Sequence, residues 1–149
     1  MKTTHINLSD DSSKGLLQLQ GSGVPAVFSD YVRVECGGAV ELFISGIVGT
    51  DASGKVVGRS VKEQTEKVLS TINEILGREG ATFDHVVRVR VYLTQLDSQT
   101  LRDVHEIRSR FFTKGRYPAS TLVRVSQLIP DGGLIEIDAD AIIPIGSGD

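Results

Sequence analysis

The sequence predicts a single α+β domain across its 149 residues, with the element order β-β-α-β-α-β-β. Three observations support this fold class. Several short segments alternate apolar and polar residues, as strands with one buried face do. Two longer segments repeat apolar residues every three or four positions, as amphipathic helices do, and glycine-rich turns separate the segments. We expect a mixed sheet with both helices on one face.

The N-terminal part is expected to hold an irregular segment and then two paired strands. Residues 1–25 are rich in Ser, Gly and Asp around a short apolar patch, which indicates an irregular or weakly extended segment. Residues 27–35 (VFSDYVRVE) and 39–49 (AVELFISGIVG) carry β-branched and aromatic side chains. Gly37-Gly38 separates these two segments, so an antiparallel pair is predicted.

The first helix has the clearest signals in the chain. Ser60 is followed three residues later by Glu63, which is the spacing of a capping box. Apolar and semi-apolar side chains then follow the helical period over residues 61–76. Gly77 and Gly80 supply the stop. The sequence therefore predicts a helix that begins directly after Ser60.

A strand and a second helix are predicted next. Residues 85–93 (HVVRVRVYL) should form a strand. One face of this strand is expected to carry Val87, Val89, Val91 and Leu93, and the other Arg88, Arg90 and Tyr92. The second helix is expected from about Ser98 to Phe112, because apolar residues recur there at spacings of three and four.

The C-terminal region is predicted to be a hairpin that pairs roughly residues 119–128 with 134–142 across a Pro-Asp-Gly-Gly break. The second strand places Glu136, Asp138 and Asp140 on one face, where three carboxylates repel one another unless they meet water, a cation or a substrate. We expect Glu136 to face a cleft. The two aspartates are expected to lie toward three arginines on neighbouring strands: Arg88, Arg90 or Arg124.

Composition narrows the class of protein. The chain is 40% hydrophobic and 23% charged, with a formal charge of −3, so it has no global attraction for nucleic acid or an anionic membrane. Its one cysteine, Cys36, excludes an internal disulfide. No apolar run is long enough to span a bilayer and no secretory signal is present, so a cytoplasmic protein is expected. The three histidines lack metal-ligand spacing, and neither a metal nor another cofactor is predicted.

Several short segments occur in a fixed order over about residues 27–143. They are Tyr31, FISGIVG with Ser45-Gly46, Gln64-Thr65, VVRVRVYLTQL, Phe111-Phe112, Tyr117-Pro118-Ala119 and Ile135-Glu136-Ile137. Together they resemble the Rid (YjgF/YER057c/UK114) family, many of whose members are enamine/imine deaminases. The resemblance implies a chorismate-mutase-like fold and a homotrimer. It also implies three equivalent small-molecule sites in clefts between the subunits.

The resemblance also implies roles for single residues. Glu136 matches the glutamate that positions the attacking water, and Tyr31 matches a tyrosine of the cleft. Ser45 and Gly46 match a Ser-Gly pair of the cleft. In deaminating members an arginine follows the Pro118-Ala119 pair and anchors the substrate carboxylate.

This chain departs from that pattern at two positions. Ser120 stands where the anchoring arginine is expected, and a serine cannot clamp a carboxylate as a guanidinium does. Arg124 follows on the same strand face, about 13 Å further along, and could anchor a longer substrate or form an intersubunit salt bridge. His105 replaces an asparagine usual in the family. It is either a proton donor or acceptor, or a histidine of the helix surface or an interface.

Two classes of function follow from these residues. The leading hypothesis is an enamine/imine deaminase that adds water to a C=N carbon and releases ammonia. Without an arginine at position 120, the substrate is expected to be a longer or ring-derived compound, such as an aminomuconate-type intermediate, rather than 2-aminoacrylate. The alternative is a non-catalytic trimer that binds a small metabolite or a partner protein. Nucleic acid and membrane partners are not expected.

Overall fold

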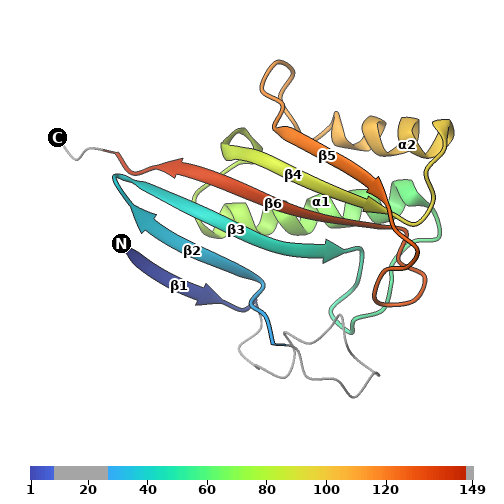
Figure 1. The fold of residues 1–149 in the computed structure, drawn as a ribbon, viewed down its shortest axis with the longest axis horizontal. Helices are drawn as coiled ribbons and strands as arrows, with labels where there is room; N and C mark the ends of the chain where they lie inside the picture. Colours follow the sequence, from blue (N-terminus) through green and yellow to red (C-terminus); the bar gives the residue numbers. More distant parts are fainter. Residues whose placement is uncertain (9–26, 147–149) are drawn as a thin grey trace.

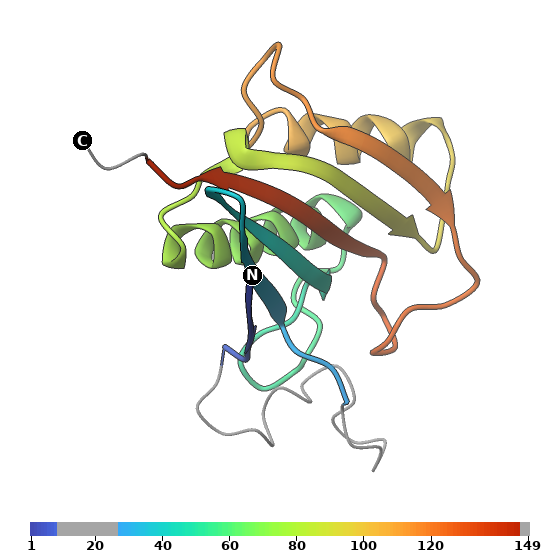
Figure 2. The ribbon, with the colours of Figure 1, turned by 60° about the vertical axis from the view of Figure 1, so that its left-hand side comes forward.

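The sheet has six strands in the order β1-β2-β3-β6-β4-β5 (Figure 1). The computed structural model describes residues 1–8 and 27–146. Both helices cover the same face of the sheet, and the other face carries none (Figures 1 and 2). The elements are β1 Lys2–Ile6, β2 Tyr31–Cys36, β3 Ala39–Val48, α1 Val61–Arg78, the short 3-10 helix η2 Phe83–His85, β4 Val86–Leu93, α2 Ser98–Arg108, β5 Ala119–Arg124 and β6 Ile135–Pro144. The predicted α+β class is confirmed.

The N-terminus contains a regular strand that the sequence did not predict clearly. Lys2–Ile6 forms β1 and pairs antiparallel with β2, from Lys2 opposite Glu35 to Ile6 opposite Tyr31. The segment was expected to be irregular or weakly extended; these five residues are extended and form a regular strand, because the free edge of β2 supplies hydrogen-bond partners that a local pattern cannot reveal. The remainder of that segment, residues 9–26, lies outside the described residues. β2 and β3 form the predicted antiparallel pair.

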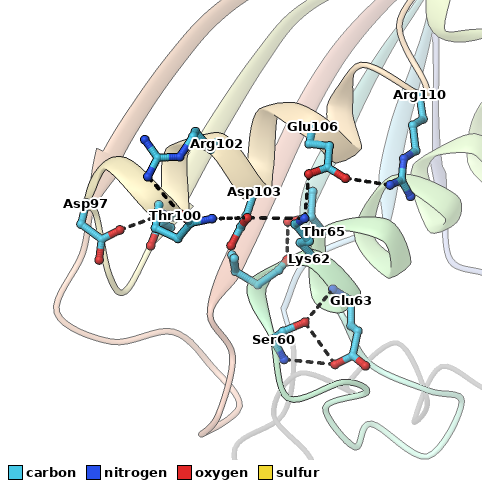
Figure 3. Close-up of polar contacts among 12 residues, drawn as sticks. Ser60, Lys62, Glu63, Thr65, Asp97, Thr100, Arg102, Asp103, Glu106 and Arg110 are labelled. Atoms are coloured by element: carbon cyan, nitrogen blue, oxygen red, sulfur yellow. Dashed lines mark hydrogen bonds and ion pairs between the residues drawn. The ribbon is translucent and has the colours of Figure 1, made fainter.

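The predicted capping box begins α1. The Ser60 hydroxyl accepts a hydrogen bond from the Glu63 backbone N–H at 3.2 Å, and the Glu63 carboxylate accepts one from the Ser60 N–H at 3.1 Å (Figure 3). Two orphan donors of the first helical turn are thereby satisfied. The helix continues past Gly77 and ends at Arg78, and Gly80 follows with a positive φ of 68°.

Ion pairs hold α2 against α1. The Lys62 ammonium lies 2.6 Å from the Glu106 carboxylate and 3.6 Å from that of Asp103 (Figure 3). Asp97 caps α2 by accepting a hydrogen bond from the Thr100 N–H at 2.8 Å. The helix ends at Arg108, four residues before the predicted Phe112, because the chain there tightens into bonds between residues three apart. This end of α2 borders one of the two cavities described below.

The hydrophobic core lies between the helices and the sheet. On β4 it contains Val89, Val91 and Leu93, as the alternation predicts. Val87 was expected with them but is 44% exposed. The pairing of β4 with β6 shifts register between Val86 and Arg88, and this irregularity turns Val86 inward in place of Val87.

The predicted C-terminal hairpin is wrong. β5 pairs parallel with β4, whereas β6 lies between β3 and β4 and is antiparallel to both. The crossover through α2 returns the chain in the direction of β4, which makes β5 parallel to it. Every second residue of β6 is buried from Ile135 to Ala141, as a central strand requires. The Gln64 side chain binds the chain just before β6, because the Leu134 N–H donates a hydrogen bond to the Gln64 amide oxygen at 2.7 Å.

Candidate functional site

The first candidate region is a row of carboxylates on β6, Glu136, Asp138 and Asp140, called here the acidic row. Its members alternate with buried residues, so they face the side of the sheet that has no helices. Across the sheet on β4, Tyr92 lies opposite Glu136 and Arg90 lies opposite Asp138. The cross-strand register therefore places a cation beside part of the row and a phenol beside its first member.

Arg90 forms ion pairs with two of the three carboxylates of the acidic row. One guanidinium nitrogen lies 2.6 Å from the Asp138 carboxylate and the other lies 3.1 Å from that of Asp140. The Tyr92 hydroxyl also donates to Asp138, at 3.1 Å. These hydrogen bonds and charges raise the pKa of Arg90 well above its usual range. The expectation that both aspartates lie toward a neighbouring arginine is confirmed.

Glu136 is the member of the row that Arg90 does not pair with. Burial raises the pKa of its carboxyl group above the ordinary value of 4.5, and the charge of Asp138 raises it further. Its carboxylate lies against Gly46: a Cβ at Gly46 would stand 1.8 Å from a Glu136 carboxylate oxygen. A glycine at this position therefore makes room for the glutamate.

An irregularity in β3 brings Ser45 and Gly46 to this carboxylate. The register between β3 and β6 shifts between Ile44 and Ile47. The Ser45 hydroxyl donates to the Ser29 carbonyl at 2.6 Å, which holds the bulged segment to the chain before β2. A cavity of about 400 Å³, the Glu136 cavity, opens here. It is lined by Phe28, Ile44, Ser45, Gly46, Arg90 and the acidic row.

The second candidate region is a cavity of about 460 Å³ between the end of α2 and the start of β5, the Arg108 cavity. Residues from α2 and the turn after it form one side, and the segment that enters β5 forms the other. Its lining residues are His105, Arg108, Ser109, Phe112, Tyr117, Pro118 and Ser120. Three predicted site residues, His105, Pro118 and Ser120, are thus brought together.

Arg108 is the most unusual residue of this cavity. It is only 8% exposed, and burial lowers the pKa of its guanidinium. Two of its nitrogens lie 3.3 Å from the Ser120 hydroxyl, and its guanidinium carbon lies 5.6 Å from the centre of the Phe112 ring. Within residues 1–8 and 27–146, no carboxylate forms an ion pair with it.

His105 stands one helical turn before Arg108 on the same cavity wall. Burial lowers the pKa of its imidazole below the ordinary value of 6.5, and the positive charge of Arg108 lowers it further. The imidazole is therefore neutral near pH 7, where it can both donate and accept a hydrogen bond. This side of the cavity thus carries the cation Arg108 beside a neutral imidazole.

The two cavities lie on opposite faces of the sheet. Ser120 pairs with Val89, which is buried beneath the helices, whereas Glu136 pairs with Tyr92 on the open face. Ala119, paired with Arg88, begins β5 beside the second cavity. Within one chain, the predicted site residues that line a cavity therefore form two separate sets, one on each face of the sheet.

Tyr31 and Arg124 belong to neither cavity. The Tyr31 ring is buried in the core on the helix face, and its hydroxyl donates to the Glu79 carboxylate at 2.7 Å. Burial, and then the contact with Glu79, raise the pKa of Tyr31 to about 12. The Arg124 side chain is exposed and donates to the Thr94 carbonyl at 3.3 Å. Within one chain Tyr31 does not line the Glu136 cavity, and its place in a cleft between subunits stays a prediction.

Arg108 is the site residue that sequence reasoning missed. A signal for it exists, because it follows Val104 by four residues and so falls on the buried stripe of α2, where an arginine is out of pattern. It also precedes Phe112 by four residues, the spacing that brings both side chains to one cavity. A charged residue on an apolar stripe points to a partner or ligand that meets its charge.

The structure gives no ligand set for a metal and no membrane-crossing helix in the part of the chain that it describes. In residues 1–8 and 27–146, no three His, Cys, Asp or Glu side chains are grouped as metal ligands would be. Neither helix in those residues is long and apolar enough to cross a bilayer. The chemistry of both cavities is therefore considered from their side chains.

Comparison with known proteins relates the chain from β2 to β6 to one family. The family model described as Endoribonuclease L-PSP matches residues 23–143, a stretch that includes every residue lining either cavity. Protein DfrA of Myxococcus xanthus is 37% identical over 116 residues, covering 77% of this chain and 84% of that protein. A Bos taurus protein named 2-iminobutanoate/2-iminopropanoate deaminase is 37% identical over 103 residues, covering 68% and 72%.

A solved structure extends this likeness to three dimensions. A Mycobacterium tuberculosis member of the YjgF/YER057c/UK114 family matches with a TM-score of 0.69 at 29% identity. The match covers 95% of this chain and 100% of that one. The likeness therefore includes the strand order that separates the two cavities.

Proposed function

The chain belongs to the Rid (YjgF/YER057c/UK114) family, and from this premise we propose that it hydrolyses the C=N bond of an imine, reached directly or from its enamine, and releases ammonia. The observation that carries this proposal is the half-buried Glu136 carboxylate, which lies against Gly46 beneath an open cavity. Relatives with deaminase names support the same reaction class.

In the proposed reaction, Glu136 is the general base. Its carboxylate takes a proton from a water molecule while the water oxygen forms a bond to the imine carbon. Glu136 passes this proton to the imine nitrogen, which gives a neutral carbinolamine. The hydroxyl proton of the carbinolamine then moves to the nitrogen as the C–N bond breaks, so ammonia leaves and a C=O bond forms. The raised pKa of Glu136 makes it a stronger base than an exposed glutamate, and Arg90 occupies the neighbouring aspartates so that they do not compete for the water.

We further propose that the active site forms between copies of the chain in a homotrimer of about 48 kDa, three times the chain mass of 16.1 kDa. Within one chain, two strand spacings and three residues separate Glu136 from Ser120, roughly 14 Å between their Cα atoms. They also face opposite sides of the sheet. This geometry supports a site in which the Glu136 cavity of one copy faces the Arg108 cavity of another.

The proposed substrate is a longer or ring-derived imine or enamine acid, such as an aminomuconate-type compound, rather than 2-aminoacrylate. Ser120 leaves no cation on β5 close to the reacting centre, and Arg108, whose guanidinium contacts Ser120, is a buried residue. A longer molecule reaches further into the Arg108 cavity than a three-carbon acid does. In this arrangement His105, one helical turn from Arg108, is a neutral hydrogen-bonding group available to the substrate.

Ammonia release from imines generated in situ tests the reaction class. Short 2-imino acids and longer, planar ones would be compared in the same assay, against spontaneous hydrolysis without protein. The proposal expects acceleration, with the longer substrates turned over faster. Hydrolysis of the whole panel at the spontaneous rate, together with saturable binding of the same compounds, would instead support a non-catalytic metabolite-binding protein.

The description of the family model also names a ribonuclease activity, and the same preparation can be tested for it. The formal charge of −3 and the carboxylates around the Glu136 cavity disfavour the approach of a phosphate backbone. We therefore expect no cleavage of single-stranded RNA above a buffer control. Cleavage that disappears in Glu136→Gln would replace the imine with RNA as the substrate.

A further inference from the structure

The Arg108 guanidinium is a buried charge with unused hydrogen-bonding capacity. A guanidinium has five N–H donors, and the contacts it makes within the described residues go to one neutral oxygen, the Ser120 hydroxyl, and one aromatic ring, that of Phe112. Burying a charge is unfavourable unless an opposite charge or strong acceptors compensate it. An anionic ligand in the cavity would supply both.

Arg108 reaches the position that a residue-120 side chain would otherwise occupy. Its two terminal nitrogens are each 3.3 Å from the Ser120 hydroxyl, although Arg108 is carried by α2 and Ser120 by β5. A serine is short enough to leave space for this guanidinium. We infer that Arg108 binds the carboxylate of the substrate, so that the anchor of this chain comes from α2 instead of β5.

The walls of the cavity specify what the carboxylate is attached to. Phe112, Tyr117 and Pro118 offer apolar surfaces, and the Phe112 ring also makes a cation–π contact with the guanidinium. Arg108 is the cation of this wall, because His105 is neutral and the nearby Arg116 is paired with Asp84 at 2.9 Å. The inferred ligand therefore presents one carboxylate to this cavity, with a planar, apolar group next to that carboxylate.

The choice of an imine acid as the natural ligand rests on the proposed function, whereas the carboxylate site can be tested without any reaction. Benzoate is a suitable probe because it is a planar monocarboxylate, and benzamide has nearly the same shape without the charge. Calorimetric titration of the wild-type protein should give saturable benzoate binding and at least tenfold weaker benzamide binding. Equal binding of the two probes would overturn the inference.

Substitution of Arg108 tests the residue itself. Arg108→Met keeps the length of the side chain but removes the charge, and should weaken benzoate binding by about 10- to 100-fold without changing benzamide binding. Arg108→Lys keeps the charge on a folded protein but loses the fork, so its effect should be intermediate. Arg124→Gln is the matched control, because it removes an exposed arginine outside the cavity, and should bind benzoate as the wild type does.

A double variant that exchanges the positions of the arginine and the uncharged residue gives the most direct test of the anchor. Arg108→Met combined with Ser120→Arg moves the guanidinium to β5, and should restore benzoate binding to within about threefold if the position of the charge is what matters. If the wild type hydrolyses imines but Arg108→Met keeps its KM and its benzoate affinity, the anchor is wrong and the reaction stands. If benzoate binding depends on Arg108 while no imine is hydrolysed, the reaction is wrong and the carboxylate site stands.

Discussion

The acidic row and the Arg108 cavity differ in the number of their charged side chains and in how those side chains are paired. In the row, carboxylates crowd one strand face, and Arg90 pairs with both Asp138 and Asp140 within the chain. In the cavity, a single guanidinium is buried among neutral groups. Among the described residues, each region also has one charged group that forms no ion pair: Glu136 in the first and Arg108 in the second. Glu136 and Arg108 are the two groups that the proposed substrate would contact.

The largest effect on activity is expected from a substitution in the acidic row. Glu136→Gln keeps the size of the side chain but cannot accept a proton from water, so kcat for imine hydrolysis should fall by about 10²- to 10⁴-fold. KM should change little, because the inferred carboxylate anchor lies elsewhere. Asp140→Asn is the control within the same row and should be mild, since its carboxylate is engaged by Arg90. Full activity of Glu136→Gln would remove the proposed base.

Gly46→Ala should disturb the same carboxylate without altering its chemistry. The new Cβ would stand 1.8 Å from a Glu136 oxygen, so the flexible end of that side chain must move. A displacement of this order should lower kcat/KM by about 10²-fold, while the unfolding midpoint in urea stays close to that of the wild type. Gly77→Ala is the matched control, because its Cβ would meet nothing within 4 Å. Equal activity of the two variants would show that the position of the carboxylate is unimportant.

The pH dependence separates Glu136 from an ordinary glutamate. The active form is the carboxylate, so kcat/KM should fall as pH falls through a pKa that lies above 4.5. Asp138→Asn removes the second cause of the raised pKa, and should shift this acid limb to lower pH while burial keeps it above 4.5. An acid limb at or below 4.5 in the wild type would contradict the assignment of Glu136 as the base.

The smallest effect on activity is expected at Tyr31, which lies in neither cavity. Tyr31→Phe removes the hydrogen bond to Glu79 and should lower the free energy of unfolding by about 1 kcal/mol in urea titrations. Activity should stay within about twofold, because the hydroxyl faces the core on the helix side of the sheet. A tenfold or larger loss of kcat, with stability unchanged, would instead show that Tyr31 contributes to the active-site cleft.

The sequence predicted the elements whose signals are local. Ser60 and Glu63 mark the start of α1 because a capping box needs residues three apart, and the acidic row follows from the two-residue period of a strand. Which strand pairs with which depends on contacts between residues far apart in the sequence. The Pro-Asp-Gly-Gly break therefore predicted a hairpin from its local pattern, whereas β6 pairs with β3 and β4. The α2 crossover, which makes β5 parallel to β4, decides this arrangement.

The candidate site was predicted in part for the same reason. Family matching brought Glu136 and Gly46 together, and the structure confirms that their atoms are in contact range. It could not show which face of β2 carries Tyr31, because one position along a strand reverses the direction of a side chain. It also overlooked Arg108, since a guanidinium that replaces a missing partner can come from any element whose side chain reaches the same point.

The central claim is that one active site combines Glu136 of one copy with Arg108 of another. Chains carrying Glu136→Gln and chains carrying Arg108→Met can be co-expressed with different affinity tags, and mixed assemblies isolated by two successive purifications. In a cyclic trimer, each mixed assembly regains one site with both wild-type halves, so kcat/KM at low substrate concentration should recover to about one third of the wild-type value. Activity no greater than the mean of the two single variants would place both residues in separate or single-chain sites and contradict the account.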